Sequence, residues 1–462
     1  MRFYAAAGAL LLSSAAALDL NVDDPSSVKN AAAVLAHGMV VYYKGNLTGE
    51  TPGLLPLGYY WWEAGAFFGS LIDYWYYTGD TQYNEIVTQG MLFQVGDNDF
   101  MPPNQTKTLG NDDQGFWGLA AMSAAEVNFP NPPDDSPQWL ALAQGVFNSQ
   151  ALRWDSTTCG GGLRWQIFAF NSGYNYKNSI SNGCFFNLAA RLAYYTGNTS
   201  YSDWASRTWD WTESVGLIDP NYSIFDGTND NTGCTSLNHI QWTYNSGVFL
   251  LGASVMWNMS MAANGNSSSG SNSTGDAAKW ETRIRGLIKG ANVFFKNGIM
   301  YEVACEPQVN CNTDQQSFKA YLSRWMAASQ KLAPFIKDLV QPNLQTSAEA
   351  AAKSCSGGTD GVTCGSTWLT GSWDGKYGIG QQMNALEVVQ GMLIDQVRGP
   401  LTMFTGGTSR GNPSAGTEGD GNPSGKLKPI TTADKAGAGI LTALVLIGLL
   451  GGAWYVLAEN RI

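Results

Sequence analysis

The apolar positions of the chain follow a repeated pattern. Residues 65–83, GAFFGSLIDYWYYTGDTQY, match residues 183–201, GCFFNLAARLAYYTGNTSY, at a constant offset. In the second copy Phe185, Leu188 and Leu192 fall at helical spacing on one apolar face. The Thr-Gly that follows ends the helix, because glycine adopts a left-handed backbone at low cost. Each copy therefore predicts a helix, a tight turn and a returning helix.

Several further segments show helical spacing, while alternating strand patterns are scarce. They are SGVFLLGASVMWN, ETRIRGLIKGANVFF, SFKAYLSRWMAASQKL and QMNALEVVQGMLI. The pattern indicates a mostly α-helical domain built from repeated helical hairpins.

The loops before the predicted helices mix aromatic residues, polar residues and glycine. Examples are GYYWWEAG, YNYKNSISNG and TGSWDGKYGIGQQ. If the hairpins close into a ring, these loops converge on one concave face. Such a face suits sugars, which need flat rings against their C–H surface and fixed polar groups for their hydroxyls.

An adjacent pair of carboxylates occurs in GNDDQGFWGLAAMSAAE, residues 110–126. Asp112 and Asp113 precede an apolar, helix-like run. One interpretation is helix capping, because negative charge is favourable near a helix N-terminus. The other is a nucleophile and an acid acting on a sugar. The stretches NVDDPSS and PPDDSPQW also contain Asp-Asp and are typical of loops or caps, so the pair needs support from elsewhere.

The start of the chain carries a targeting pattern. In MRFYAAAGALLLSSAAALDL, one basic residue, an apolar run and small residues predict a signal peptide over residues 1–17. Asn-x-Ser/Thr sequons occur at Asn46, Asn104, Asn198, Asn221, Asn258, Asn266 and Asn272. Their density in a chain with a signal peptide predicts a glycoprotein that enters the secretory pathway.

The C-terminal region combines a polar segment with an apolar tail. Residues 401–436 are rich in Gly, Ser and Pro, which predicts a flexible stalk. With the apolar run in residues 437–462 they form a GPI-attachment signal, with acceptable attachment positions between Gly419 and Gly425. Because the chain ends ENRI, a retained membrane-spanning helix is the alternative. Residues 18–400 contain no linker of domain-boundary character and are interpreted as one domain.

Composition limits the kinds of partner and catalytic site that the chain can have. The formal net charge of −11 disfavours nucleic acid as a partner. With only His37 and His239 in the chain, little room is left for histidine-dependent triads or histidine-rich zinc sites. His37 lies in a helical run and is interpreted as structural, whereas His239 is a weak candidate for a ligand contact. No Cys/His spacing resembles a metal site, and neither a metal nor a cofactor is expected.

Seven cysteines in an oxidising compartment predict three disulfides and one free thiol. The predicted pairs are Cys159/Cys234, Cys305/Cys311 and Cys355/Cys364. The last two pairs are close in sequence, and Cys184 lies in an amphipathic run where a buried free thiol fits. The spacing alone does not determine this connectivity.

These loops and helix starts resemble glycoside hydrolase family 76, the endo-α-1,6-mannanases, and within it the fungal GPI-anchored wall proteins. The resemblance rests on NDDQGFWGLAAMSAAE, CGGGLRWQI, YNYKNSISNGCFFNLAARLAYYTGN and QWTYNSG, with the signal and the tail, and spans residues 20–400. It implies an all-α fold, an (α/α)6 barrel of six helical hairpins, which agrees with the repeat.

The resemblance also implies roles for the two carboxylates. Asp112 is expected to be the nucleophile and Asp113 the general acid/base of a retaining double displacement. Retention needs carboxyl groups roughly 5–5.5 Å apart. Since consecutive helical residues point in different directions, the pair is expected in the turn before the helix rather than within it. Like charges raise one pKa, while the helix N-terminus favours the ionised partner.

Further residues of these loops are candidates for contacts with a bound sugar. The stacking candidates are Trp62, Trp117, Trp165 and Tyr244. The hydrogen-bonding candidates are Asn111, Gln114, Gln166, Asn178 and Asn245. Lys177 is expected to bind a hydroxyl or a phosphate. Each has a structural role as its alternative.

Three functions fit these observations. The resemblance implies a retaining cell-wall enzyme that cleaves α-1,6-linked mannose, in a mannoside or in the core of a GPI anchor, and passes the attached protein to a β-glucan acceptor. Simple hydrolysis of mannan is the close alternative. A non-catalytic mannan-binding protein is the third, and the presence of both carboxylates weighs against it. The protein is expected to be a monomer anchored at the outer face of the plasma membrane and in the cell wall.

Overall fold

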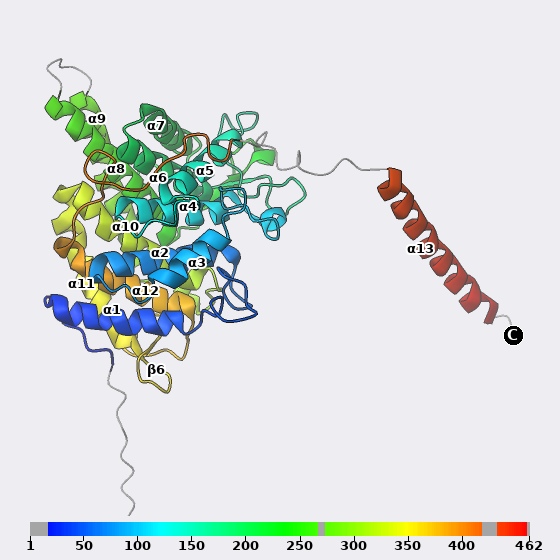
Figure 1. Cartoon of the computed structure of the whole chain (residues 1–462), viewed down its shortest axis with the longest axis horizontal. Helices are drawn as coiled ribbons and strands as arrows, with labels where there is room; N and C mark the ends of the chain where they lie inside the picture. Colours follow the sequence, from blue (N-terminus) through cyan, green and yellow to red (C-terminus); the bar gives the residue numbers. More distant parts are fainter. Residues whose placement is uncertain (1–16, 267–272, 418–431, 460–462) are drawn as a thin grey trace, which may run out of the picture. The chain divides into compact units, whose positions relative to one another are not determined.

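Helices dominate the protein, as the hydrophobic pattern predicts. The computed structural model describes residues 17–266, 273–417 and 432–459 (Figure 1). They fall into two units, a body that reaches Thr417 and a C-terminal helix, and each is considered by itself. Of the predicted signal peptide, all but Ala17 lies outside the described residues.

The elements of the body are as follows. The helices are α1 Pro25–Val40, α2 Trp61–Thr78, α3 Asn84–Phe93, α4 Asn111–Glu126, α5 Trp139–Leu152, α6 Ser179–Thr196, α7 Thr199–Ser214, α8 Thr243–Asn266, α9 Ser273–Gly290, α10 Phe318–Leu332, α11 Lys337–Ser354 and α12 Ile379–Gln390. The short strands are β1 Tyr176–Asn178, β2 Gly227–Asn229, β3 Leu237–Asn238, β4 Phe295–Lys296, β5 Ile299–Met300, β6 Cys355–Gly357 and β7 Thr363–Cys364.

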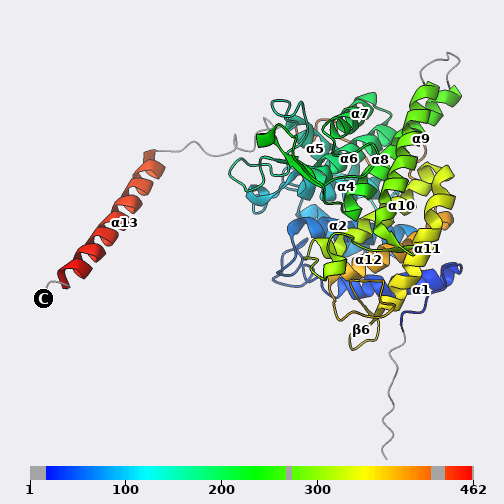
Figure 2. The same cartoon turned by 180° about the vertical axis from the view of Figure 1, so that it is seen from behind.

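The even-numbered helices form an inner ring and the odd-numbered helices surround it (Figure 1 and Figure 2). α2 packs against α4, and the contacts continue through α6, α8 and α10 to α12, which packs against α2 and closes the ring. Each outer helix packs against an inner neighbour, as α5 does against α4 and α7 against α6. This arrangement is an (α/α)6 barrel and confirms the fold expected from the sequence.

The repeated pattern corresponds to two of the hairpins. α2 ends at Gly79, whose φ is 78°, and α6 ends at Gly197, whose φ is 70°. In both cases the left-handed glycine terminates the inner helix, and the chain returns as α3 or α7. Phe185 and Leu192 on the apolar face of α6 are fully buried. The helix, turn and returning helix predicted from the sequence are confirmed.

Long and short connections alternate along the body. The connections from an outer helix into an inner helix are long: residues 41–60, 94–110, 153–178, 215–242, 291–317 and 355–378. The connections that leave an inner helix are shorter, such as residues 79–83 and 197–198. The long loops therefore gather where the inner helices begin, here called the loop end. The opposite end is called the floor.

Disulfides and short strands join the long loops to one another. Cys159 bonds Cys234, which links two successive loops whose β1 and β2 also pair. The other disulfides are Cys305–Cys311 and Cys355–Cys364, and Cys184 is a buried free thiol. The connectivity expected from the sequence is confirmed.

The predicted boundary of the flexible stalk is wrong. Residues 401–417, here called the strap, pack against the body (Figure 1). The Leu401 N–H donates to the Glu126 carbonyl at 2.8 Å, the Leu140 N–H donates to Ser409 Oγ at 2.9 Å, and Asn148 Nδ2 donates to the Pro413 carbonyl at 2.9 Å. A polar, glycine-rich composition predicted disorder because it offers little apolar surface. Here hydrogen bonds to the backbone hold the segment instead.

The C-terminal unit is the helix α13, Thr432–Glu459. Its segment Lys435–Trp454 is long and apolar enough to cross a membrane, by length and composition. Most of the predicted GPI-attachment region, between Gly419 and Gly425, lies outside the described residues.

The predicted glycosylation sites differ in accessibility. The exposed ones are Asn46, Asn104, Asn198 and Asn221. Asn258 is half-buried, and its amide nitrogen, the atom that a glycan would modify, donates to the Leu332 carbonyl at 2.8 Å. The folded body therefore does not present Asn258. Asn272 and the side chain of Asn266 lie outside the described residues.

Candidate active site

A cleft of about 750 Å³ opens at the loop end of the barrel. Its walls come from the long loops and from the first residues of the inner helices. Of the residues predicted from the sequence, the cleft is lined by Trp62, Asp112, Asp113, Trp165, Gln166, Asn178 and Tyr244. Helix entrances far apart in the chain therefore converge on one concave surface, as the ring predicts.

The carboxylate pair lies within the first turn of α4, so the expectation that it precedes the helix is wrong. Asp113 Oδ2 accepts a hydrogen bond from the Gly110 N–H at 2.6 Å, and Asp112 Oδ1 accepts one from the Asp113 N–H at 3.1 Å. The first N–H groups of a helix lack carbonyl partners four residues earlier, so carboxylates are held there. A Cβ on Gly110 would lie 2.3 Å from Asp112 Oδ1, so glycine leaves room for the pair.

Burial dominates the electrostatics of the pair. It raises the pKa of Asp112 well above its ordinary value, and the neighbouring charge of Asp113 adds to this. Burial likewise raises the pKa of Asp113 to about 7, although the Gly110 N–H opposes the shift. Near neutral pH the pair therefore retains a proton. This is the condition that an acid next to a nucleophile requires.

Two further carboxylates in the cleft were missed by the sequence analysis. Asp314, before α10, accepts a hydrogen bond from Trp62 Nε1 at 2.9 Å. Asp226, before β2, accepts one from the Tyr176 hydroxyl at 2.6 Å. Burial raises the pKa of both. Among the described residues neither forms an ion pair. Neither aspartate has an acidic residue beside it in the sequence, so spacing offered no signal beyond its place before an inner helix.

Three of the predicted aromatic residues lie in the cleft. Tyr244 stacks on Phe318 with ring centroids 3.9 Å apart, and Trp165 is 37% exposed. Trp62 packs against neighbouring rings while its Nε1 holds Asp314. These side chains present ring faces or edges to a ligand.

Trp117 is a correction, because it does not reach the cleft. Its ring is fully buried, stacks on Trp61 at 4.8 Å and donates from Nε1 to the Trp61 carbonyl. Its neighbour Phe116 lines the cleft instead. One step along a helix rotates a side chain by about 100°, so of two consecutive rings only one faces the ligand.

Three of the predicted polar residues also lie away from the cleft. Asn111 donates from Nδ2 to the Arg164 carbonyl at 2.8 Å. Gln114 donates from Nε2 to the Asp99 carbonyl at 2.7 Å. Asn245 is fully buried, and its amide has no hydrogen-bond partner among the described residues. Their structural interpretation, not the ligand contact, fits this placement.

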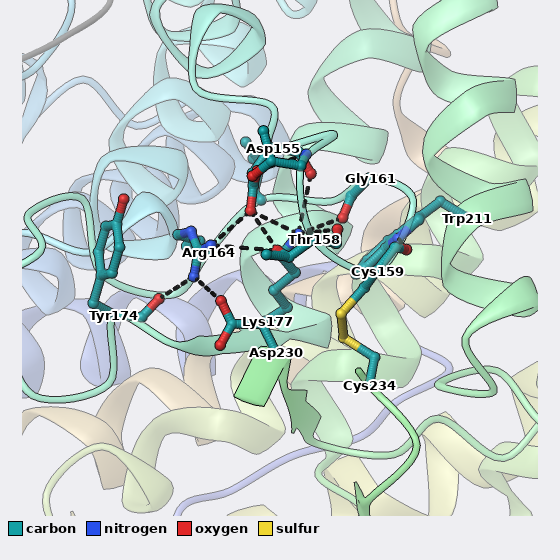
Figure 3. Close-up of polar contacts among 12 residues, drawn as sticks. Asp155, Thr158, Cys159, Gly161, Arg164, Tyr174, Lys177, Trp211, Asp230 and Cys234 are labelled. Carbon is teal, nitrogen blue, oxygen red and sulfur yellow. Dashed lines mark hydrogen bonds and ion pairs between the residues drawn. A yellow bond between two sulfur atoms is a disulfide. The ribbon is translucent and has the colours of Figure 1, made fainter. Parts of the chain in front are cut away.

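Lys177 is buried rather than available to a hydroxyl or phosphate (Figure 3). Its ammonium donates to the carbonyls of Asp155, Thr158 and Gly161 at 3.1, 2.9 and 2.6 Å. Beside it, Arg164 lies 2.7 Å from Asp155 (Figure 3). The cluster holds residues 153–165 against β1. Asn178 follows Lys177 in this strand, and its Nδ2 lies 3.4 Å from Asp112 Oδ2.

The histidines lie outside the cleft lining. His37 is exposed in the last turn of α1. His239 packs against Phe225, with ring centroids 4.3 Å apart. Within the described residues no group of three or more His, Cys, Asp or Glu side chains could hold a metal ion.

Comparison with known proteins agrees with this geometry. The model of glycosyl hydrolase family 76 matches residues 27–403. The mannan endo-1,6-alpha-mannosidase DCW1 of Candida glabrata is 48% identical over 97% of this chain and 98% of its own length. The crystal structure of Dfg5 from Chaetomium thermophilum in complex with glucosamine has a TM-score of 0.80 and 46% identity, covering 86% of this chain and 97% of its own.

A more distant structure shares the fold alone. The GH76A α-1,6-mannanase of Salegentibacter has a TM-score of 0.59 at 18% identity, over 79% of this chain and 98% of its own. Together with the family match, the repeat and the carboxylate pair, these likenesses identify the class of the protein. The chain belongs to glycosyl hydrolase family 76 and is a glycoside hydrolase.

Proposed function

We propose that the protein cleaves α-1,6-linked mannosides with retention and transfers the released glycan from a GPI core to a wall glucan. The observation that carries the proposal is the Asp112–Asp113 pair in a cleft lined by aromatic rings. The relative in Candida glabrata is named a mannan endo-1,6-alpha-mannosidase and is 48% identical, which supports the same substrate class here.

Two displacements account for retention. In the first, a carboxylate oxygen of Asp112 bonds to the anomeric carbon while the bond from that carbon to the glycosidic oxygen breaks. The leaving oxygen takes the proton of Asp113. In the second, Asp113 removes a proton from water or from a sugar hydroxyl, and the oxygen of that acceptor displaces Asp112.

The first displacement needs the proton of the pair on Asp113. In the empty cleft burial raises the pKa of both carboxyl groups, so the pair holds a proton that either oxygen set can carry. Positive charge develops on the sugar ring in the transition state and favours the ionised form of the carboxylate beside it. We infer that this charge keeps Asp112 ionised and leaves the proton of the pair on Asp113.

The additional carboxylates favour a GPI-core donor over plain mannan. Asp226 and Asp314 line the cleft without an ion pair among the described residues, so they suit a ligand with a protonated amine. The relative from Chaetomium thermophilum was crystallised in complex with glucosamine, an amino sugar. A GPI core joins its mannoses to a glucosamine with a free amine, whereas mannan carries no amine.

Transfer and hydrolysis differ only in the second acceptor. A glycosyl-enzyme intermediate reacts with a sugar hydroxyl in place of water when that hydroxyl is bound and positioned. The predicted signal peptide and the apolar α13 support the outer surface of the plasma membrane as the location of the proposed reaction, with the protein held by a GPI anchor or by a retained helix. Mannan hydrolysis is the alternative.

The test uses the purified full-length protein with α-1,6-mannotetraose, with and without a β-glucan oligosaccharide, and mass spectrometry of the products. Mannose–glucan hybrids that are absent with Asp112→Asn are expected. Shorter mannosides alone would establish a hydrolase. A synthetic GPI-core glycan is then compared with its N-acetylated form; faster turnover of the free amine is expected. Binding without any turnover would contradict the enzyme and leave a mannan-binding protein.

A further inference from the structure

A half-buried cation contacts both residues that flank the catalytic pair, and the two displacements do not use it. Arg153 directly follows α5, the outer helix that packs against α4. Its Nε donates to Asn111 Oδ1 at 2.8 Å, and its Nη2 donates to Gln114 Oε1. Asn111 and Gln114 are the residues on either side of the pair in NDDQ. One guanidinium therefore holds this turn on both sides of the carboxylates.

We propose that Arg153 is a positioning residue for the reaction of Asp112 and Asp113, which rests on the function proposed above. It acts by holding the first turn of α4 in one orientation about the helix axis. That orientation decides where the two carboxylates stand relative to the sugar.

The first turn of a helix depends on such outside contacts. Its N–H groups have no carbonyl four residues earlier, so helix ends fray unless other groups bind them. At Asn111 every polar group is bonded. The N–H donates to the Trp165 carbonyl at 2.8 Å, Nδ2 donates to the Arg164 carbonyl, and the carbonyl accepts from Gln150 Nε2 at 2.7 Å. Arg153 supplies the remaining contact, at Oδ1, and among the residues that the structure describes it alone bonds the side chains of both Asn111 and Gln114.

Arginine suits this position because two donors on one edge of the guanidinium, Nε and Nη2, reach acceptors from two different side chains. A guanidinium presents its donors in a rigid planar fork, whereas a lysine ammonium is a point charge on a flexible stem. The third nitrogen of the fork, Nη1, donates to Met101 Sδ at 3.5 Å. Burial lowers the pKa of Arg153 to about 10 and the charge of Asp99 opposes that shift, so the group is charged at neutral pH.

Arg153 also brings a positive charge to the two residues that flank the pair. The other titratable groups near the pair are the Cys184 thiol from α6, the Tyr244 hydroxyl from α8 and the Asp314 carboxylate before α10. Asp99, from the loop before α4, faces Arg153. These groups are neutral or negative, and a nearby cation lowers the pKa of carboxyl groups. Removing the positive charge of Arg153 should therefore raise the apparent pKa values of the limbs of the pH–rate profile.

The opposite end of α4 provides a matched control. Arg191 is buried, and its Nη2 lies 2.6 Å from Glu126 Oε2 and 2.8 Å from Ser123 Oγ in the last turn. Both arginines hold an end of the same helix, but Arg191 bonds residues at the end remote from Asp112 and Asp113, whereas Arg153 bonds the two residues that flank them. Loss of either should destabilise the fold, and only loss of Arg153 should alter the chemistry.

The experiment compares Arg153→Lys, Arg153→Met and Arg191→Met with the wild-type full-length protein. Rates per folded molecule and their pH profiles are measured on α-1,6-mannotetraose below each variant's unfolding temperature. Misplacement of catalytic groups by about 1 Å costs on the order of 100-fold in rate. We expect kcat to fall about 30- to 100-fold for both Arg153 variants, with KM changed less than about threefold. The apparent pKa values of the limbs of the pH–rate profile should rise for Arg153→Met. They should stay as in the wild-type protein for Arg153→Lys, which keeps the positive charge. Arg191→Met should have the wild-type kcat and limbs.

Two outcomes would overturn the proposal. One is a wild-type kcat per folded molecule in Arg153→Lys. The other is an equal loss in Arg191→Met, because a general effect of destabilisation would then explain both. If Arg153→Met does not fold, Arg153→Lys alone decides. If the wild-type protein turns over no mannoside, the proposed function fails. The inference is then decided by the carboxyl titration of Asp112 and Asp113, followed by NMR: an upward shift in Arg153→Met but not in Arg191→Met supports it, and no difference refutes it.

Discussion

The two ends of α4 carry the same kind of side chain in opposite circumstances. At the floor, Glu126 lies 2.6 Å from the guanidinium of Arg191. At the loop end, Asp112 and Asp113 accept hydrogen bonds from neutral donors, and among the described residues neither forms an ion pair. Burial raises the pKa of both aspartates, whereas Glu126 has its charge compensated.

The contrast extends to neighbouring helices. At the floor, Asp73 and Glu387 share the guanidinium of Arg324 at 2.7 and 2.5 Å, whereas Asp226 and Asp314 in the cleft have no such partner among the described residues. One guanidinium does not fully compensate the charges of two carboxylates, since burial still raises the pKa of Asp73 to about 7. Paired carboxylates hold the barrel together, and unpaired ones remain able to exchange protons with a substrate.

Removal of the acid at the loop end should produce the largest effect. In Asp113→Asn we expect kcat/KM on α-1,6-mannotetraose to fall by about 10²- to 10⁴-fold, because proton donation is lost. The folded pKa of about 7 lies above the unfolded value, so ionisation of Asp113 destabilises the wild-type protein as pH rises through 7. The variant should therefore be more stable at pH 8, by on the order of 2 kcal/mol. Kinetics and denaturant unfolding check both.

The matched control for that variant is Asp135→Asn. Asp134 and Asp135 are also adjacent, but both are exposed in the loop before α5. Rate and stability should stay as in the wild-type protein. Equal losses of rate in the two variants would contradict the assignment of Asp113.

Breaking the Arg191–Glu126 ion pair at the floor should have the opposite effect, a loss of stability instead of a loss of rate. Arg191→Met leaves Glu126 buried without its cation, which costs about 3–5 kcal/mol of unfolding free energy. Guanidinium chloride unfolding measures the loss. Arg410→Met is the control, because its pair with Asp134 is solvent-exposed and should contribute about 0–1 kcal/mol. Similar losses in both variants would remove the distinction between paired floor and unpaired cleft.

The strap, residues 401–417, runs along α5 from the floor and should increase the free energy of unfolding. A body that ends at Pro400 loses the hydrogen bonds of Leu401, Ser409 and Pro413 with the barrel. At about 1 kcal/mol for each bond, we expect a loss on the order of 3 kcal/mol relative to a body that ends at Thr417. Equal unfolding midpoints would show that the strap is not part of the folded body.

The smallest predicted effect is a change in pH dependence. Glu63 is 1% exposed at the start of α2, and burial raises its pKa to about 8. A raised folded pKa stabilises the protein at low pH, and this contribution is lost as pH rises from about 4 through 8. In Glu63→Gln the free energy of unfolding should depend less on pH between about 4 and 8, and at pH 9 it should be higher by about 1–2 kcal/mol. An unchanged slope in unfolding measured from pH 5 to 9 would contradict the pKa shift.

Local features were predictable from the sequence wherever a residue type acts through its chain neighbours. The match between residues 65–83 and 183–201 predicts two hairpins, because the spacing of apolar residues and the left-handed glycine are local properties. Cys305–Cys311 and Cys355–Cys364 are close in sequence and were predictable in the same way, whereas spacing alone did not determine Cys159–Cys234. The pair Asp112–Asp113 was identifiable because its members are adjacent, although its position inside the helix was not.

What only the tertiary structure decided is which side each side chain faces and which distant residue it meets. Phe116 lines the cleft and Trp117 is buried, since about 100° of helical rotation separates them and only the packing of α2 selects the buried one. Lys177 satisfies carbonyls of another loop, and Asp226 and Asp314 reach the cleft from loops of different hairpins. The sequence by itself determined the helices, their repeat and the adjacency of Asp112 and Asp113. The closure of the ring decided the rest, because contacts between residues far apart in the chain depend on how the helices pack.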